Sequence, residues 1–247
     1  MRYFIELSYF GKAYHGWQRQ PNAITVQQVL EEVFTTLTGS EKSLVAAGRT
    51  DAGVHAKQLF AHFESEKIED KVDLVFRLNS FLPDDISVKR IVAVPDGAHA
   101  RFDAIERTYE YWLIQKKNPF YVDFAHFVKQ PLAIQKMNEA AKVLMQYDDF
   151  ECFSKSNTDV KTYLCALKKA EWAEVGNRLV FTITADRFLR NMVRSIVGTL
   201  LEVGLGKWSA DDVKVILESK DRSKAGPSVP AKGLYLTKVE YPQNLIK

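Results

Sequence analysis

The order of its apolar patterns is the feature that most constrains the fold of this chain. Every second residue from Tyr3 to Tyr9 is apolar, as expected for a half-buried strand. From Thr25 to Gly39 the apolar spacing changes to three and four residues, which predicts an amphipathic helix with Thr25 as its N-cap. Further elements are predicted at Ser43–Ala47 (strand), Lys57–Glu64 (strand), Asp73–Leu82 (helix, with Phe81 inward) and Ile86–Val94 (strand). The order is βαββαβ.

From Glu106 the same order recurs without an obvious repeat of residues. The predicted elements are Glu106–Gln115 (strand), Leu132–Gln146 (helix), Val160–Trp172 and Arg178–Ala185 (strands joined by a turn at 175–177), Leu189–Val203 (helix) and Gly233–Tyr241 (strand), with an additional helix at Ala210–Glu218. The sequence therefore predicts an α+β fold of two ferredoxin-like halves, residues 1–104 and 105–247. Their mainly antiparallel sheets are expected side by side, with an active-site cleft between them.

Composition argues against several classes of protein. No apolar stretch among the 247 residues approaches the length of a membrane span, and the N-terminus lacks the pattern of a cleaved signal, so we expect a cytoplasmic protein. Cys152 and Cys165 are the only cysteines, and we expect both to be reduced. The histidines form no metal-ligand motif and no glycine-rich phosphate loop is present, so neither a metal nor a cofactor is predicted.

The net charge of +3 is mild, but the basic residues gather in two segments. One is a loop with Lys220, Arg222, Lys224 and Lys232; the other contains Arg187, Arg190 and Arg194. A groove or mobile loop lined with basic side chains is suited to bind the phosphate backbone of a nucleic acid. Taken alone, the lysine-rich loop is more simply interpreted as a solvated surface segment.

The most distinctive motif is GRTDAGVHA, residues 48–56. In an extended chain Arg49 and Asp51 project to the same side, where the guanidinium would favour the ionised carboxylate. Gly48 and Gly53 allow a left-handed backbone and close approach of a ligand. Asp51 is therefore a candidate nucleophile, although a turn with a surface ion pair is an equally simple interpretation of the motif alone.

Arg190 and Arg194 are four residues apart and are predicted to share one face of an otherwise apolar helix. Arginines in such surroundings need partners, because an unpaired buried charge is costly. Asp51 of the other half is one available acid. On periodicity alone, a purely structural ion pair with another carboxylate such as Glu202 or Glu171 is the simpler interpretation.

Taken together, the motifs resemble the tRNA pseudouridine synthase A (TruA) family over nearly the whole chain. Besides GRTDAGVHA they are YHGWQRQP (14–21), TVQQVLEEVF (25–34), LNSFLPDDISV (78–88), HARFDAIERTYEY (99–111), FLRNMVRSIVGTL (188–200) and GPSVPAKGLYL (226–236). The resemblance implies a homodimeric isomerase that converts uridine to pseudouridine in the tRNA anticodon stem-loop, at positions 38, 39 and 40, without metal or cofactor.

The resemblance also implies roles for individual residues. Asp51 corresponds to the nucleophile, Arg194 to its basic partner and Tyr109 to the tyrosine that stacks on the target base, although a strand tyrosine is more often structural. Substrate contacts are expected from Gln18, Arg19, Arg49, Arg187, Leu189 and Arg190, with Trp17 and Gln20 as further RNA-contact candidates, whereas His55 is expected to pack within its loop.

Departures from the family pattern are Thr108 and Glu110, where basic residues are common, and Arg190 and Asn191, where histidines are common. These could alter RNA preference without removing the chemistry. Three other functions remain open from the sequence: a synthase with another RNA target, a non-catalytic RNA-binding protein, and a nucleoside hydrolase. The last is disfavoured because no second acid lies at a recognisable spacing.

Overall fold

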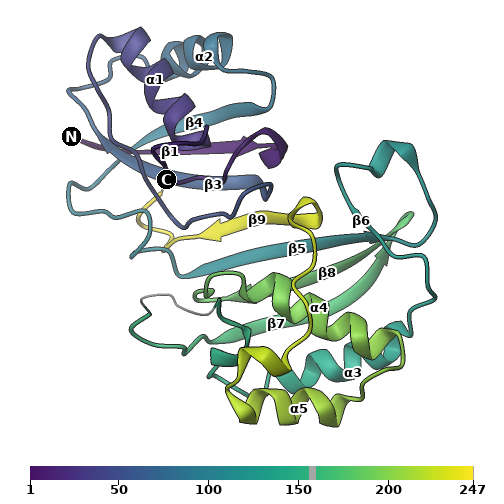
Figure 1. Ribbon diagram of the computed structural model, residues 1–247. Helices are drawn as coiled ribbons and strands as arrows, with labels where there is room; N and C mark the ends of the chain where they lie inside the picture. Colours follow the sequence, from purple (N-terminus) through teal and green to yellow (C-terminus); the bar gives the residue numbers. More distant parts are fainter. Residues whose placement is uncertain (156–159, 247) are drawn as a thin grey trace. The chain divides into compact units, whose positions relative to one another are not determined.

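The computed structural model describes residues 1–155 and 160–246 and groups them in two compact units (Figure 1). Unit 1 comprises Met1–Arg107 together with the C-terminal segment from Tyr235, and unit 2 comprises Thr108–Leu234. The last strand is thus grouped with the N-terminal unit. Helices and mainly antiparallel strands occur in both units, which confirms the predicted α+β class.

Unit 1 contains β1 (Arg2–Tyr9), β2 (Val45–Ala46), β3 (His55–Glu64), β4 (Ile86–Val94), β9 (Leu234–Glu240), α1 (Val26–Thr38), α2 (Lys71–Phe81) and the 3-10 helix η1 (Gly11–Ala13). Its strands lie in the order β4-β1-β3-β9. β1 is antiparallel to both β3 and β4, whereas β9 runs parallel to β3. β2 is a short strand that pairs antiparallel with β3 at Ala61 and His62, near the opposite end of β3 from the residues that pair with β9.

The two helices of unit 1 lie on one face of this sheet (Figure 1). The Thr25 hydroxyl accepts a hydrogen bond from the Gln28 amide, as predicted, and Gly39 ends α1 in the left-handed conformation. In α2, Leu74 and Leu78 are buried. Phe81, predicted inward, is 58% exposed, because the helix ends there and the extended Leu82 turns its side chain into the core instead.

Unit 2 contains β5 (Glu106–Ile114), β6 (His126–Phe127), β7 (Leu167–Val175), β8 (Arg178–Ala185), α3 (Ile134–Leu144), α4 (Met192–Gly204) and α5 (Ala210–Ser219). It also contains the 3-10 helices η2 (Pro119–Tyr121), η3 (Glu151–Phe153), η4 (Arg222–Lys224) and η5 (Ala231–Gly233). Its sheet has the order β5-β8-β7, and α3, α4 and α5 lie together on one side of it (Figure 1).

The predicted strand at Val160–Trp172 begins only at Leu167 and continues to Val175. Before Leu167 the backbone donors bind elsewhere: the Cys165 amide donates to the Asp148 carbonyl, and the Ala166 amide to the Asp186 carboxylate. These bonds leave the segment outside the sheet ladder. The predicted hairpin turn before β8 is present, with Gly176 in the left-handed conformation.

The predicted helix at Leu189–Val203 begins three residues late, at Met192. Asn191 precedes it with φ of 66°, a left-handed conformation that interrupts helical geometry and that asparagine tolerates better than most residues. Leu189 and Arg190 therefore lie outside the helix. No helix in the described part of the chain is long and apolar enough to span a bilayer.

Candidate active site

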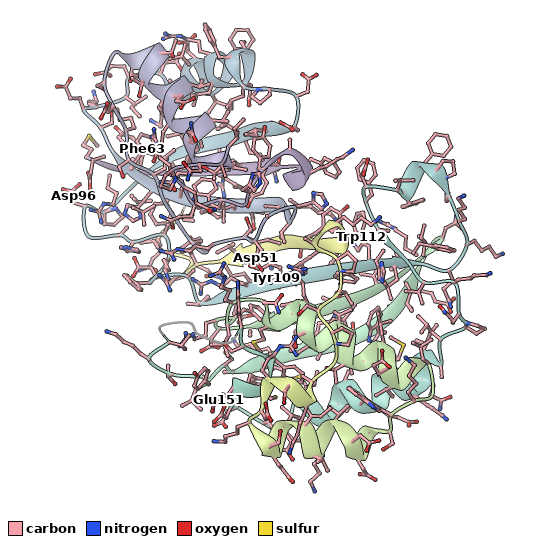
Figure 2. All side chains as sticks on the ribbon, viewed as in Figure 1. Asp51, Phe63, Asp96, Tyr109, Trp112 and Glu151 are labelled. Atoms are coloured by element: carbon pink, nitrogen blue, oxygen red, sulfur yellow. The ribbon has the colours of Figure 1, made fainter. Side chains whose placement is uncertain are left out.

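Asp51 lies on the loop between β2 and β3 of unit 1, where its side chain is partly exposed (Figure 2). The loop turns tightly, because the Val54 amide donates to the Asp51 carbonyl at 3.2 Å and Gly53 has φ of 76°. Gly53 thus supplies the left-handed residue that the sequence predicts at this point. Arg49 is exposed on the same loop, and its contact with Asp51 stays a prediction.

The residues beside Asp51 are held by a segment far away in the sequence. The Thr50 carbonyl accepts from the Trp17 amide at 3.3 Å, and the Thr50 hydroxyl shares a 2.8 Å hydrogen bond with the Tyr9 hydroxyl. The Gly53 amide donates to the Tyr14 carbonyl at 3.2 Å. The loop is therefore fixed through backbone groups on both sides of the carboxylate.

Two glycines make this close approach possible. A Cβ atom on Gly16 would lie 2.3 Å from the Thr50 carbonyl oxygen, and one on Gly11 would lie 2.0 Å from the Val54 carbonyl oxygen. Gly16 also has φ of 87°, which side-chain-bearing residues rarely adopt. Residues 9–17 can approach the Asp51 loop this closely only because Gly11 and Gly16 lack side chains.

The same segment is anchored from a third part of unit 1. The Tyr14 hydroxyl donates to an Asp85 carboxylate oxygen at 2.5 Å, and the Phe10 amide donates to the Asp85 carbonyl at 2.8 Å. Burial and the Asp85 carboxylate raise the pKa of Tyr14, which keeps the phenol protonated as a donor. Asp85 belongs to the LPDD sequence, so two of the recognised motifs meet here.

Trp17, a candidate RNA contact by sequence, is 2% exposed and packs beside Tyr9. It therefore supports the loop from the core and presents no surface to a ligand, which corrects that expectation. Gln18 and Arg19 are exposed, and the Arg19 guanidinium lies 3.3 Å from the Glu31 carboxylate. These two remain available at the surface of unit 1.

His55 has a structural role, as predicted. It is 1% exposed, its Nδ1 accepts from the Gly11 amide at 2.9 Å, and its ring stacks on Phe10 with centroids 4.2 Å apart. An Nδ1 that accepts a backbone hydrogen bond in the core is not placed to remove a proton from a substrate. His55 instead fixes the start of β3, directly after the Asp51 loop.

In unit 2, Tyr109 projects from β5 and is half-buried (Figure 2). Its ring meets Phe188 edge to face, with centroids 5.1 Å apart and planes at 87°. Such a contact fixes the orientation of the tyrosine ring. Tyr111, two residues along the same strand, is fully buried and donates its hydroxyl to the Pro230 carbonyl at 2.8 Å.

Arg194 lies in the first turn of α4 and is hydrogen-bonded to residues 226–230, the GPSVP segment. Its Nε donates to the Val229 carbonyl at 2.7 Å, and the Val229 amide donates to the Arg194 carbonyl at 3.2 Å. The segment can approach this closely because Gly198 has no side chain: a Cβ there would lie 1.8 Å from the Pro227 carbonyl oxygen. This packing orients Arg194 from two sides.

The carboxylates considered as structural partners of Arg194 form ion pairs with lysines. Glu202 lies 2.7 Å from Lys207, and Glu171 lies 2.5 Å from Lys169. Neither pair involves an arginine. The pairing of Arg194 with Asp51 stays a prediction.

The remaining predicted contacts of unit 2 surround the start of α4. Arg190 is exposed, and its carbonyl accepts a hydrogen bond from the Lys155 amide. Leu189 is buried. Arg187 is partly exposed, and its amide donates to the Asp186 carboxylate. Because Arg190 precedes the helix and Asn191 reverses the local backbone, the predicted helical face shared by Arg190 and Arg194 is wrong. Arg190 lies in the non-helical backbone before α4, whereas Arg194 lies in the first turn of that helix.

Several residues of the lysine-rich loop have partners within the protein. Lys220 pairs with Asp149 at 2.6 Å, and Lys232 donates to the Val122 carbonyl at 2.7 Å. Arg222 donates to the Ala225 carbonyl and the Ser228 hydroxyl. At least part of this basic cluster therefore has a structural role.

The residues that hold the Asp51 loop were not predicted from the sequence: Tyr9, Gly11, Tyr14, Gly16, Thr50 and Asp85. The available signal was the concentration of glycine, tyrosine and tryptophan in residues 9–17. Glycines among aromatic residues indicate close backbone packing as readily as a ligand site. Among the described residues, no group of three or more His, Cys, Asp and Glu side chains is arranged to hold a metal ion.

Comparison with known proteins identifies the family. A family profile described as tRNA pseudouridine synthase matches residues 7–103 and 140–242. A tRNA pseudouridine synthase A of Parabacteroides distasonis is 53% identical over 99% of this chain and 97% of its own length. Those of Bacteroides fragilis and Bacillus subtilis are 51% and 40% identical, over 100% and 98% of this chain and 98% and 99% of their own lengths. The chain belongs to the tRNA pseudouridine synthase family, whose members are isomerases that act on tRNA.

Proposed function

We propose that this protein isomerises uridine to pseudouridine in the anticodon stem-loop of tRNA, at positions 38, 39 and 40, with Asp51 as the nucleophile. The observation that carries the proposal is the placement of one partly exposed carboxylate on a loop held by residues 9–17, which are themselves anchored to Asp85. A nucleophile must be held in a productive position before the substrate arrives, and a rigid loop meets that requirement.

The reaction breaks the bond between C1′ of the ribose and N1 of uracil and forms a bond between C1′ and C5, while the C5 proton is lost and N1 gains a proton. No atom is gained or lost overall, so neither an oxidant nor an energy source is required. A glycosidase with two carboxylates uses the second to direct water at the sugar. In the proposed reaction water must be kept away, so that the freed base is recaptured, and a single carboxylate suffices.

Arg194 is proposed to pair with Asp51 and to orient its carboxylate, since a guanidinium and a carboxylate form directional, charge-assisted hydrogen bonds. Its clamp to Val229 would hold the guanidinium in place while the substrate binds. Tyr109 is proposed to stack on the target base and to assist removal of the C5 proton. Its contact with Phe188 fixes the ring that would receive the base.

A base paired or stacked in a stem cannot reach a carboxylate until it is flipped out, which costs a few kcal/mol. RNA contacts offset that cost, and we propose Gln18, Arg19, Arg49, Arg187, Leu189 and Arg190 as substrate-binding residues. We further propose that the protein acts as a homodimer in the cytoplasm. Two copies would give a chain of mild net charge enough basic surface to hold a folded tRNA.

The proposal is tested with unmodified tRNA transcripts that carry tritium at C5 of uridine. Isomerisation exchanges the C5 hydrogen with water, so the label is released, and the modified positions are then mapped by chemical probing. We expect release from positions 38 to 40 only. Release from another position would assign a different target, and tight binding without release would indicate a non-catalytic RNA-binding protein.

A further inference from the structure

The loop from Ala98 to Ala104 in unit 1 presents an aromatic side chain to solvent. Phe102 is 74% exposed. The Arg101 guanidinium lies 5.7 Å from the centre of the Phe102 ring, within the range of a cation–π contact. The centres of the His99 and Phe102 rings are 4.2 Å apart, and the two ring planes form an angle of 34°. The phenylalanine is thus flanked by a cation and a second ring.

This loop is rigid although its tip is exposed. The Ala98 carbonyl accepts from Arg2 at 2.8 Å, and the Ala100 carbonyl accepts from the Tyr241 hydroxyl at 2.5 Å. The Ala100 amide donates to Nδ1 of the buried His62 at 3.1 Å. Because side chains hold both sides of its backbone, the loop need lose little conformational entropy when a ligand binds.

The Phe102 backbone is fixed as well. Nδ1 of His99 accepts from the Arg101 and Phe102 amides at 3.1 and 3.3 Å, and the His99 amide donates to the Asp103 carboxylate at 2.7 Å. The ring of Phe102 is therefore carried on a turn whose amides are bound. An exposed aromatic ring on a fixed turn is suited to receive another flat ring.

Arg107 connects this turn to the loop that carries Asp51. Its Nη2 donates to the Ala47 carbonyl at 3.0 Å and to the Arg101 carbonyl at 2.5 Å, and its Nη1 donates to the Ala104 carbonyl at 2.8 Å. Ala47 immediately precedes Gly48, the first residue of the GRTDAGVHA motif. One guanidinium thus binds the Phe102 turn and the base of the Asp51 loop together.

The two other phenylalanines that are exposed to a similar extent lack these features. Phe76 on α2 is 70% exposed and Phe120 in η2 is 83% exposed. Within residues 1–155 and 160–246, neither ring stacks on another ring or lies beside a cation. Single exposed apolar residues are ordinary on protein surfaces, so exposure alone does not distinguish Phe102. Its neighbouring cation, its fixed turn and its connection to the Asp51 loop do.

We propose that Phe102 and Arg101 form a base-stacking subsite for an unpaired nucleotide of the tRNA, close to the nucleotide that is isomerised. Base stacking on aromatic rings is tolerant of sequence, because every base has a flat face. Arg101 adds a positive charge for the adjoining phosphate. The inference rests on the proposed function, since it assigns part of the same substrate to a further site.

The test compares binding of unmodified tRNA by the wild type and by Phe102→Ala, Phe102→Leu and Phe102→Trp. We expect Phe102→Ala and Phe102→Leu to bind about 5- to 100-fold more weakly, with melting temperatures near that of the wild type. Phe102→Trp should bind like the wild type, and its additional tryptophan fluorescence should be quenched by tRNA. Phe76→Ala, a matched loss of an exposed phenylalanine in the same unit, should bind normally.

Wild-type affinity in Phe102→Leu, or an unquenched tryptophan in Phe102→Trp, would overturn the subsite. An equal loss of affinity in Phe76→Ala would also overturn it. The binding experiment is independent of catalysis. If the wild type binds tRNA but releases no C5 label, the proposed function fails while the subsite is still tested by the affinities of these variants.

Discussion

The loop that carries Asp51 and the segment that carries Arg194 are positioned by different means. The Asp51 loop depends on contacts with distant residues, because Tyr9, Tyr14 and Trp17 bind its backbone and the Thr50 side chain. The Arg194 segment depends on a local change of backbone at Asn191 and on one packed neighbour, Val229. Substitutions should therefore disturb the acid from far away in the sequence and the arginine from nearby.

The two regions also differ in what they supply to Asp51: contacts within unit 1 fix its position, whereas Arg194 is proposed to supply a positive charge. The contacts with the Asp51 loop involve mainly carbonyls, amides and hydroxyls, and they fix position without supplying a formal charge. The proposed charge partner, Arg194, is supplied by unit 2. The position of Asp51 and its pairing with a cation are then distinct requirements, which variants in the two regions can separate.

The largest effect is expected at the arginine itself. Arg194→Met should lower kcat by about 100-fold, the usual cost of removing one electrostatic group from a reacting centre. Arg190→Met should reduce turnover no more than a few-fold, because Arg190 is exposed and lies before α4. The measurement is single-turnover release of C5 label. A larger loss in Arg190→Met than in Arg194→Met would show that the wrong arginine has been assigned.

The next effect tests the distant contacts of the Asp51 loop. Gly16→Ala should destabilise the protein by about 2–4 kcal/mol, because a left-handed backbone and a backbone clash are combined there. Gly39→Ala is the matched control, since Gly39 is also left-handed at φ of 69° but has open space around it, and it should cost about 1 kcal/mol. Urea unfolding measures both. Equal costs would mean that the close approach to Thr50 contributes nothing.

A smaller effect is expected at the turn before α4. Asn191→Ala should cost about 1 kcal/mol more than Asn191→Gly, because both lose the side-chain bond to Ser228 but only glycine accepts φ of 66° freely. Unfolding midpoints and Arg194-dependent turnover can be compared in the two variants. Identical stability would indicate that the left-handed residue does not define the start of the helix.

The smallest effect concerns pH and the loop linked to Asp51 through Arg107. Burial, followed by the charges of His99 and Arg2, lowers the pKa of His62 to about 4 against the opposing effect of Glu64 and Asp103. The unfolded chain therefore takes up this proton first, and the stability contributed by neutral His62 is complete above about pH 6.5 and is lost as pH falls towards 4.

In His62→Gln, the Gln oxygen can still accept from the Ala100 amide but does not titrate. The wild type should accordingly lose more free energy of unfolding than His62→Gln between pH 6.5 and 5, measured by urea unfolding at each pH. Parallel curves for the two proteins would contradict the assignment of His62 as a neutral acceptor.

Regular elements were the part of the fold that could be predicted from the sequence. The bounds of β8 and β4 and the N-cap of α1 follow from alternation and from a single capping residue, and the structure has them as predicted. The turn at Gly176 is likewise local. Such features are encoded within a few residues, so a pattern is enough to find them.

The errors occurred where interactions outside the local pattern determine the backbone. The segment before β7 has a strand-like composition, but its amides bind Asp148 and Asp186. The helix after Leu189 has a continuous apolar pattern, yet Asn191 adopts a left-handed conformation that periodicity does not register. Trp17 looked like a ligand contact because aromatic residues serve both surfaces and cores.

For the candidate site, the motif led directly to Asp51 but not to the residues that hold it. The spacing of Gly11, Tyr14 and Gly16 has no meaning until the backbone places them against the loop. Contacts between residues far apart in the sequence leave no periodic signal in a single chain. They could be identified only from the three-dimensional structure.

The central claim is that Asp51 is the nucleophile of a uridine isomerase, and Asp51→Asn tests it most directly because the amide keeps the shape and removes the charge. Wild type and variant are compared for C5 label release from unmodified tRNA in a single turnover, with tRNA affinity measured in parallel. We predict no detectable release by the variant with affinity close to that of the wild type. Release by Asp51→Asn at a rate near that of the wild type would contradict the claim.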